Sequence, residues 1–291
     1  MLSQILLNSW QANCSQSEQL QAITNLEQGN VIFLPKLNFT LNDNEQKFLT
    51  PEIADPNAKN ISYQLQSNQL WGIRNLTEED YAALKAMLHR FAVTAESLIN
   101  NLFPHYSGHL QMAKTSFRPL QVSNRNSSYR KDDRRLHVDA FPSAPNQGRR
   151  ILRVFSNINP QDEPRVWRLG ENFEQVAKRF LPEIRPPMPF SASVFKLLKI
   201  TKSLRTAYDH YMLKLHDAMK KDLNYQKDVA QETVAFPAGS TWIVQTDDVS
   251  HAAMSGQYLL EQTFYLPVEA MQNSQKSPLK ILERLLNRKL R

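Results

Sequence analysis

The chain has 291 residues, and 41% of them are hydrophobic, which is enough for a packed core and too many for a disordered chain. The formal net charge of +7 favours anionic partners such as nucleic acid, phosphorylated sugars or lipids, or a membrane surface. The single cysteine, Cys14, excludes an intrachain disulfide and fits a reducing compartment, and no apolar run approaches the roughly 18 residues of a membrane span.

The first part of the chain contains one clear helix. Residues 1–7 lack the basic region of a signal peptide, so we expect a cytoplasmic protein. Residues 1–76 are polar and irregular apart from a short strand over 29–35. A helix begins after Thr77, a suitable N-cap that is followed by three acidic residues in the first turn, and it ends before Pro104.

Short strands dominate the rest of the chain. The pattern predicts strands over 116–122, 136–141, 150–158, 232–236, 241–245 and 259–266. It also predicts a helix near 203–224, a polar charged loop over 123–135 and a basic amphipathic helix over 278–291.

This order of elements predicts an α+β protein with a mainly β core. We expect a double-stranded β-helix, which is a cupin-like jelly roll, with flanking helices. A single domain over 1–291 would comprise an N-terminal α/β extension (1–110), the jelly-roll core (111–268) with the inserted helix, and the C-terminal helix. Such folds hold their sites in the mouth between the sheets.

One motif carries the chemistry. His137 and Asp139 are two residues apart in a predicted strand, so their side chains project from the same face. His251 follows a Pro-Ala-Gly turn, an apolar strand and an Asp-Asp loop. Two histidines and a carboxylate are the ligands of the facial triad of non-haem Fe(II) oxygenases. The sequence therefore predicts a ferrous site at His137, Asp139 and His251, and a single dioxygenase domain.

Plainer interpretations exist for each residue. His137 is also compatible with a surface position beside Arg134 and Arg135, and His251 with a hydrogen-bonded core histidine. The context around His251 favours the metal site. The other five histidines lack such surroundings and are interpreted as structural or exposed: His89, His105, His109, His210 and His216.

An Fe(II) oxygenase of this kind generally uses 2-oxoglutarate, whose far carboxylate favours an arginine roughly ten residues after the distal histidine. No Arg or Lys occurs between His251 and Lys276. Arg153, embedded in an apolar strand, and Arg118 are the alternatives, with Thr263 and Gln262 as neutral hydrogen-bonding candidates.

Two acidic residues precede the distal histidine. Asp247 and Asp248 are placed either to orient His251 from behind or to form the turn before its strand, and the turn is the favoured interpretation.

Four sequence blocks resemble the Kdo 3-hydroxylases, where Kdo is 3-deoxy-D-manno-oct-2-ulosonic acid, the acidic sugar of lipid A. They are residues 136–143, 152–160, 245–257 and 261–264. The resemblance spans most of the chain. It implies that His137, Asp139 and His251 are the metal ligands, and that the family also lacks the usual arginine near Gln262.

The resemblance further implies hydroxylation at C3 of a Kdo residue in Kdo-lipid A, with Fe(II), O₂ and 2-oxoglutarate consumed or used and succinate and CO₂ released. The expected partner is Kdo-lipid A or a related acidic glycolipid, with no nucleic acid. A lipid-linked substrate also implies peripheral contact with the cytoplasmic face of the inner membrane.

Two basic segments fit such a substrate. The first flanks the metal strand and is either an ordinary solvated loop or, as the charge of the whole group favours, a mobile lid that grips anions. It contains Arg125, Arg130, Lys131, Arg134, Arg135, Arg149 and Arg150. The second is the C-terminal amphipathic helix, which is compatible with an anionic membrane or with packing on the protein itself.

Two other functions are compatible with this sequence. An Fe(II)/2-oxoglutarate oxygenase of another anionic substrate, such as nucleic acid, would share the chemistry, although repair demethylases place paired arginines after the distal histidine. A non-catalytic jelly-roll module that binds acidic sugar or lipid would share only the charge. Anaerobic Fe(II) and 2-oxoglutarate titration separates the enzyme from the module.

Overall fold

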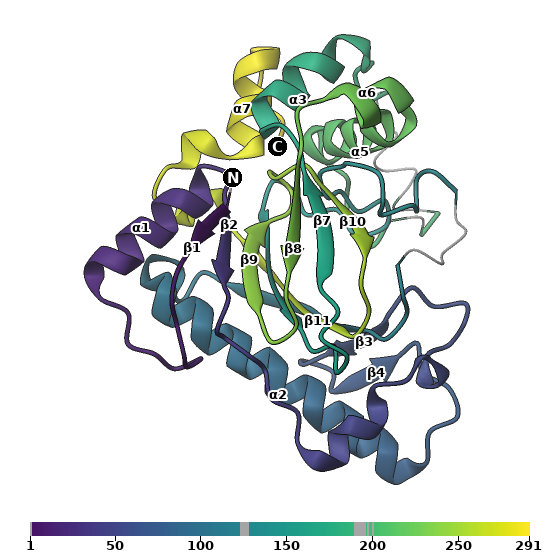
Figure 1. Cartoon of the computed structure of the whole chain (residues 1–291). Coiled ribbons are helices and arrows are strands. Elements are labelled where there is room, and N and C mark those ends of the chain that lie inside the picture. Colours follow the sequence, from purple (N-terminus) through teal and green to yellow (C-terminus); the bar gives the residue numbers. More distant parts are fainter. Residues whose placement is uncertain (1, 123–127, 189–195, 197, 200) are drawn as a thin grey trace.

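Two facing β-sheets form the centre of the protein (Figure 1). The computed structural model describes residues 2–122, 128–188, 196, 198–199 and 201–291. Within these residues the larger sheet has the strand order β1 (Leu2–Gln4), β2 (Val31–Leu34), β9 (Thr241–Gln245), β6 (Arg150–Asn157), β11 (Leu259–Leu266), β5 (Gln111–Arg118), β3 (Ile61–Gln64), β4 (Gln69–Trp71). The smaller sheet contains β10 (His251–Ser255), β7 (Arg165–Leu169) and β8 (Glu232–Phe236).

The alternation of side chains along the strands explains how the sheets pack. In β6, Phe155 faces the smaller sheet, while Leu152 and Val154 face the opposite side. Trp242 of β9 stacks on Phe236 of β8, with ring centroids 4.1 Å apart and planes 8° apart. This apolar cluster joins the sheets, and the space beside it is polar.

Helices cover the outer face of the larger sheet. The apolar stripe of α2 (Glu78–Leu102) is buried against it, and α1 (Gln16–Glu27) lies beside β2. Four more helices gather at one end of the sheets (Figure 1): α3 (Phe173–Phe180), α5 (Ala207–Lys221), α6 (Leu223–Asp228), α7 (Pro278–Leu286). Short 3₁₀-helices occupy Asp43–Phe48, Pro51–Ile53, Pro104–Tyr106, Leu181–Glu183, Val268–Ala270 and Ser274–Lys276.

Most predicted elements are confirmed, with corrections. The helix after Thr77 and the strands over 232–236, 241–245 and 259–266 have the predicted bounds to within a residue. The strand predicted over 116–122 instead spans Gln111–Arg118 and ends before Pro119, which has no N–H to donate to a ladder. The inserted helix begins at Ala207 and is followed by the short α6.

The prediction of a regular strand over 136–141 was wrong. His137 forms an isolated bridge with His251, and the Asp139 amide donates to the carbonyl of Thr246 at 2.8 Å. The hydrogen bonds of this segment therefore go to β10 and the loop before it, and the pairing breaks off after one residue.

The N-terminal segment contains more structure than predicted. Helix α1 begins with a capping box, in which Ser15 accepts from the Glu18 amide and the Glu18 carboxylate accepts from the Ser15 amide. Strands β1 to β4, all within residues 1–110, extend both edges of the larger sheet. No helix among the described residues combines the length and apolar character needed to cross a membrane.

The C-terminal helix is shorter than predicted and faces inward. Helix α7 ends at Leu286, and Asn287 adopts the left-handed conformation with φ 48°. Leu279, Ile281 and Leu282 are buried. Because the apolar face packs on the protein itself, it is not available for a membrane.

Candidate metal and co-substrate site

The structure brings the three predicted metal ligands together. One ligand atom from each of His137, Asp139 and His251 lies within 4.8 Å of the others. Two backbone hydrogen bonds join His137 and His251, at 3.0 and 2.9 Å, so the isolated bridge sets the spacing of the two imidazoles. Asp139 follows on the same segment, held by its bond to Thr246.

Backbone carbonyls orient both imidazoles. Nδ1 of His137 lies 2.7 Å from the carbonyl oxygen of Arg135, and Nδ1 of His251 lies 2.8 Å from that of Val249. Nδ1 therefore donates in each ring, which leaves Nε2 unprotonated and able to bind a metal. Trp167 stacks on His251 with ring centroids 5.1 Å apart and holds that ring from the side.

The charge states of the triad suit a divalent metal. Burial, followed by the charges of Lys220 and the neighbouring histidines, lowers the pKa of His137 well below its usual value, and burial also lowers the pKa of His251. Burial alone would raise the pKa of Asp139, but the positive charge of Arg153 lowers it below its usual range. Two neutral imidazoles and one carboxylate therefore face one point, which is the donor set that ferrous iron accepts.

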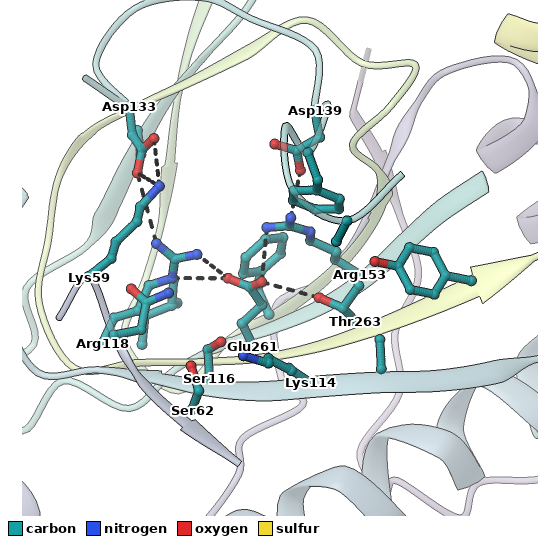
Figure 2. Close-up of a pocket in the computed structure, with 18 of the residues that line it drawn as sticks. Lys59, Ser62, Lys114, Ser116, Arg118, Asp133, Asp139, Arg153, Glu261 and Thr263 are labelled. Atoms are coloured by element: carbon teal, nitrogen blue, oxygen red, sulfur yellow. Dashed lines mark hydrogen bonds and ion pairs between the residues drawn. The ribbon is translucent and has the colours of Figure 1, made fainter. Parts of the chain in front are cut away.

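The triad opens into a cavity of about 600 Å³ between the sheets. A continuous row of alternating charges crosses this cavity (Figure 2); we call it the charge chain, and it comprises Lys59, Asp133, Arg118, Glu261, Arg153 and Asp139. The charge chain links the metal ligand Asp139 at one end to the exposed Lys59 at the other. Each carboxylate in it is therefore paired internally.

Arg153 and Arg118 both reach the cavity, but they already share a carboxylate. Arg153 lies 2.8 Å from Asp139 and 2.9 Å from Glu261, and Nε of Arg118 donates to Glu261 at 2.9 Å. Thr263 lines the same wall, with its hydroxyl 3.3 Å from Glu261. Nε of Arg153 is buried and has no hydrogen-bond partner among the described residues, which leaves a donor for a ligand.

The structure contradicts the prediction for Gln262. Alternate residues of β11 face opposite sides, so Glu261, Thr263 and Tyr265 line the cavity while Gln262 points away from it. Its side chain accepts from the Thr115 hydroxyl at 2.6 Å and donates to the Thr263 carbonyl at 2.7 Å. Gln262 is thus a structural residue of the sheet.

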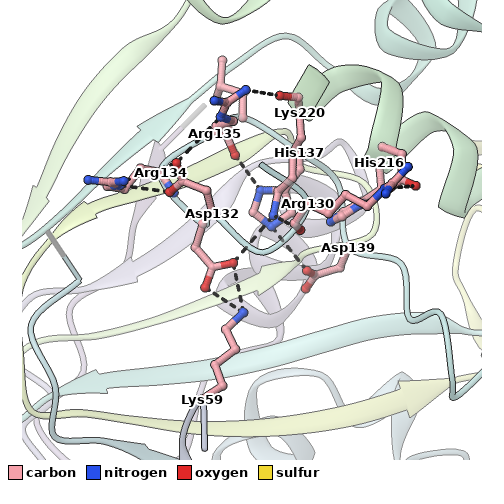
Figure 3. A network of polar contacts seen from close by, with 12 residues as sticks. Lys59, Arg130, Asp132, Arg134, Arg135, His137, Asp139, His216 and Lys220 are labelled. Carbon is pink, nitrogen blue, oxygen red and sulfur yellow. Dashed lines mark hydrogen bonds and ion pairs between the residues drawn. The ribbon is translucent and has the colours of Figure 1, made fainter. Parts of the chain in front are cut away.

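The described basic residues of the predicted lid do not line the cavity. Arg130 pairs with Asp217, Arg134 with Asp132, and Arg135 donates to the Lys220 carbonyl (Figure 3). Arg149 donates to the Asn146 carbonyl, and Arg125 lies outside the described residues. Arg134 and Arg149 thus bind within the segment, and Arg130 and Arg135 bind helix α5, so the prediction that these arginines grip an anion is not supported.

Arg150 and the Asp-Asp loop stabilise the metal site indirectly. Arg150 is fully buried, and its Nε donates to Asp247 at 2.8 Å. Asp247 also accepts from the Ile151 amide at 3.1 Å. Among the described residues, no hydrogen bond or ion pair joins Asp247 or Asp248 to His251. The two residues lie in the turn before His251, which agrees with the favoured interpretation.

The comparisons with known proteins agree with this geometry. Residues 9–289 match the sequence model of the 3-deoxy-D-manno-oct-2-ulosonic acid (Kdo) hydroxylase family. The chain belongs to the Kdo hydroxylase family. A search of the curated proteins found no match.

Solved structures of the Kdo hydroxylase KdoO, a non-heme Fe(II) alphaketoglutarate dependent dioxygenase, are similar over 99% of this chain and 97% of theirs. The complex with alphaketoglutarate and Fe(III) is 51% identical with a TM-score of 0.96, and the cobalt(II) complex is 52% identical with a TM-score of 0.97. The complex with succinate and Fe(III) is 51% identical with a TM-score of 0.96. These findings confirm the predicted family, jelly-roll fold and dioxygenase class, and the family implies a Kdo-containing substrate.

Several residues of this Kdo hydroxylase family member escaped the sequence analysis. Glu261 carries no local signal, because its role depends on two arginines from other strands. Arg165 and Trp167 line the cavity from β7, a strand that was not predicted. His216 was interpreted as structural or exposed, yet its ring lies against His137 with centroids 5.3 Å apart. The alternation of Arg165, Trp167 and Leu169 was the available signal for β7.

Proposed function

We propose that this chain hydroxylates C3 of a Kdo sugar in Kdo-lipid A, with Fe(II) and 2-oxoglutarate as cofactor and co-substrate. The observation that carries the proposal is the oriented triad of His137, Asp139 and His251, whose two histidines are buried and which opens into a cavity, in a chain of this family. Bound iron with 2-oxoglutarate would supply the oxidation of an unactivated C–H bond.

The protein's own residues position the metal ligands and exclude water from the cavity. The backbone carbonyls behind His137 and His251 keep both rings in the metal-binding tautomer, and Trp167 limits the rotation of His251. The apolar wall of Phe155, Trp167 and Leu259 keeps water from one side of the cavity.

Arg153, Arg118 and Thr263 are the proposed ligands of 2-oxoglutarate. Arginine forks suit carboxylates, and both guanidinium groups lie in the cavity beside the metal ligand Asp139. The co-substrate would share these arginines with Glu261. Arg165, which also lines the cavity and donates to the Gly256 carbonyl at 2.9 Å, is the alternative cation.

The proposed substrate indicates where in the cell the enzyme would act. Lipid A is anchored in a membrane, so the enzyme would meet it at the cytoplasmic face of the inner membrane. The buried apolar face of α7 argues that this contact uses another surface.

The decisive experiment is the His137→Ala variant, assayed with Kdo-lipid A, Fe(II) and 2-oxoglutarate under O₂. We expect loss of the product that carries one extra oxygen atom, and loss of the weak visible band of the anaerobic Fe(II)–2-oxoglutarate complex, with the fold retained. His109→Ala, at an exposed position outside the cavity, is the matched control.

Full activity of His137→Ala would remove the triad from the mechanism. A wild-type protein that forms the visible band but leaves Kdo-lipid A unchanged would retain the chemistry and exclude this substrate.

A further inference from the structure

The cavity contains more positive charge than its internal pairs use. Among the described residues that line it, six are cationic (Lys59, Lys114, Arg118, Arg153, Arg165, Lys202) and three are acidic (Asp133, Asp139, Glu261). The three carboxylates are all bound by Lys59, Arg118 and Arg153 within the charge chain. The excess charge is therefore concentrated on the remaining cations.

Lys114 and Lys202 have no acidic partner among the described residues. Both lie at the edge of the cavity, and both are exposed. Nζ of Lys114 lies 5.2 Å from the ring centre of Trp71, a contact that holds the ammonium group without neutralising it. The Lys202 amide donates to the Ser143 carbonyl at 2.9 Å, next to the segment that carries Asp139.

Lys114 and Lys202 carry the same charge and line the same cavity. Burial, and then the charge of Lys202, lowers the pKa of Lys114. Like charges from segments about 90 residues apart in sequence are unfavourable unless a counter-charge relieves them. An oxyanion between them would supply it.

Hydroxyl groups complete this corner of the cavity. Alternation along β5 puts Lys114, Ser116 and Arg118 on the same face, and Ser62 of β3 pairs with Ser116 (Figure 2). Neither hydroxyl has a hydrogen-bond partner among the described residues. Small side chains here leave space and two donors beside the lysines.

Lys114 is also well separated from Arg118 along β5. Four residues along a strand correspond to roughly 13 Å between Lys114 and Arg118. An anion held at Lys114 is therefore distinct from a co-substrate carboxylate held at Arg118.

We propose that Lys114, Lys202, Ser62 and Ser116 form an oxyanion subsite that binds a carboxylate or phosphate of the substrate and so positions the sugar over the metal triad. This inference rests on the proposed function for the identity of the substrate. We call these four residues the mouth subsite. Its ligand chemistry is an oxyanion, whose two sources are the sugar carboxylate and a lipid A phosphate.

Direct binding tests the subsite without turnover. Free Kdo and inorganic phosphate are each titrated calorimetrically into the anaerobic Fe(II)–2-oxoglutarate protein, as wild type and as Lys114→Gln/Lys202→Gln. We expect at least about a tenfold loss of affinity for one of the two probes, as removal of a charge-assisted hydrogen bond predicts. The probe that loses affinity identifies the source of the anion.

Steady-state kinetics with Kdo-lipid A provide the second readout. We expect the double variant to raise KM for the lipid about tenfold or more, with kcat and the KM for 2-oxoglutarate within about threefold of wild type. Lys131→Gln, an exposed lysine outside the cavity, is the matched control.

Unchanged affinity for both probes, or no binding of either probe to the wild type, would overturn the mouth subsite. Failure of the proposed function appears separately, as absence of oxygenated lipid from the wild-type reaction, while the visible Fe(II)–2-oxoglutarate band reports on metal and co-substrate in every variant.

Discussion

At the scale of single residues, Arg153 has the most demanding position in the protein. Its guanidinium contacts the metal ligand Asp139 and the chain's own Glu261, at 2.8 and 2.9 Å. A planar fork satisfies two carboxylates at once, whereas an ammonium group is a single point of charge. The residue therefore sets the direction of Asp139 and offers a place for a co-substrate carboxylate at the same time.

Arg153→Lys tests this geometry while keeping the charge. We expect KM for 2-oxoglutarate to rise about tenfold, because a lysine cannot replace the bidentate contact. The measurement is the 2-oxoglutarate dependence of turnover, with thermal unfolding to check the fold. Arg130→Lys, in a solvent-exposed ion pair with Asp217, should leave KM unchanged. An unaltered KM for 2-oxoglutarate in Arg153→Lys would favour Arg165 as the ligand of the co-substrate carboxylate.

At the scale of elements, local sequence and tertiary packing agree for α2. The Thr77 hydroxyl accepts from the Asp80 amide at 3.1 Å, three acidic residues occupy the first turn, and the apolar stripe lies on the sheet. Because α2 covers β3, β5 and β11, the helix supports the strands that carry Arg118 and Glu261. Its stability is therefore linked to that of the cavity wall.

Thr77→Ala removes the N-cap of α2. We expect the free energy of unfolding to fall by about 1 kcal/mol, since one amide of the first turn loses its partner. Urea unfolding followed by circular dichroism measures the change. Thr94→Ala, within the same helix, is the control and should stabilise or leave the protein unchanged, because alanine has the higher helix propensity. Equal effects at both positions would contradict the assignment of the cap.

At the scale of the whole molecule, a buried ionic cluster joins distant parts of the chain. Arg150 from β6 pairs with Asp247, and Asp248 lies 3.8 Å from the same guanidinium and close to Gly29 after α1. Arg150 connects the larger sheet to the loop that precedes His251. Burial is the main cause that raises the pKa of Asp248 to about 7 from its usual 3.8.

This raised pKa predicts a pH dependence of stability. The folded protein holds the Asp248 proton to higher pH than the unfolded chain does, so the free energy of unfolding falls as pH rises from about 4 to about 7. Asp248→Asn should remove that part of the dependence, as measured by urea unfolding across the pH range. The control is Asp228→Asn at an exposed position. A wild-type slope that survives in Asp248→Asn would exclude this residue as its origin.

Much of the candidate site was predictable because short sequence patterns mark its metal ligands. His137 and Asp139 are two positions apart, and the turn, strand and loop before His251 are visible in the sequence; the structure brings all three ligand atoms together. Arg118, Arg153 and Thr263 do line the cavity. The prediction that Gln262 lines the cavity failed because a shift of one position along a strand moves a side chain to the other face of the sheet. The register of β11 is set by β5 and β6.

The sequence alone determined the family, the order of most elements and the residues that converge on a metal, since helix caps, alternation and motif spacing act over a few neighbours. Only the tertiary structure decided which charges meet. Glu261 between two arginines, Lys114 and Lys202 at one cavity, and Arg150 turned inward all join segments far apart in the chain. Electrostatic and hydrogen-bonding partners depend on distance in space, and that distance exists only once the sheets have paired.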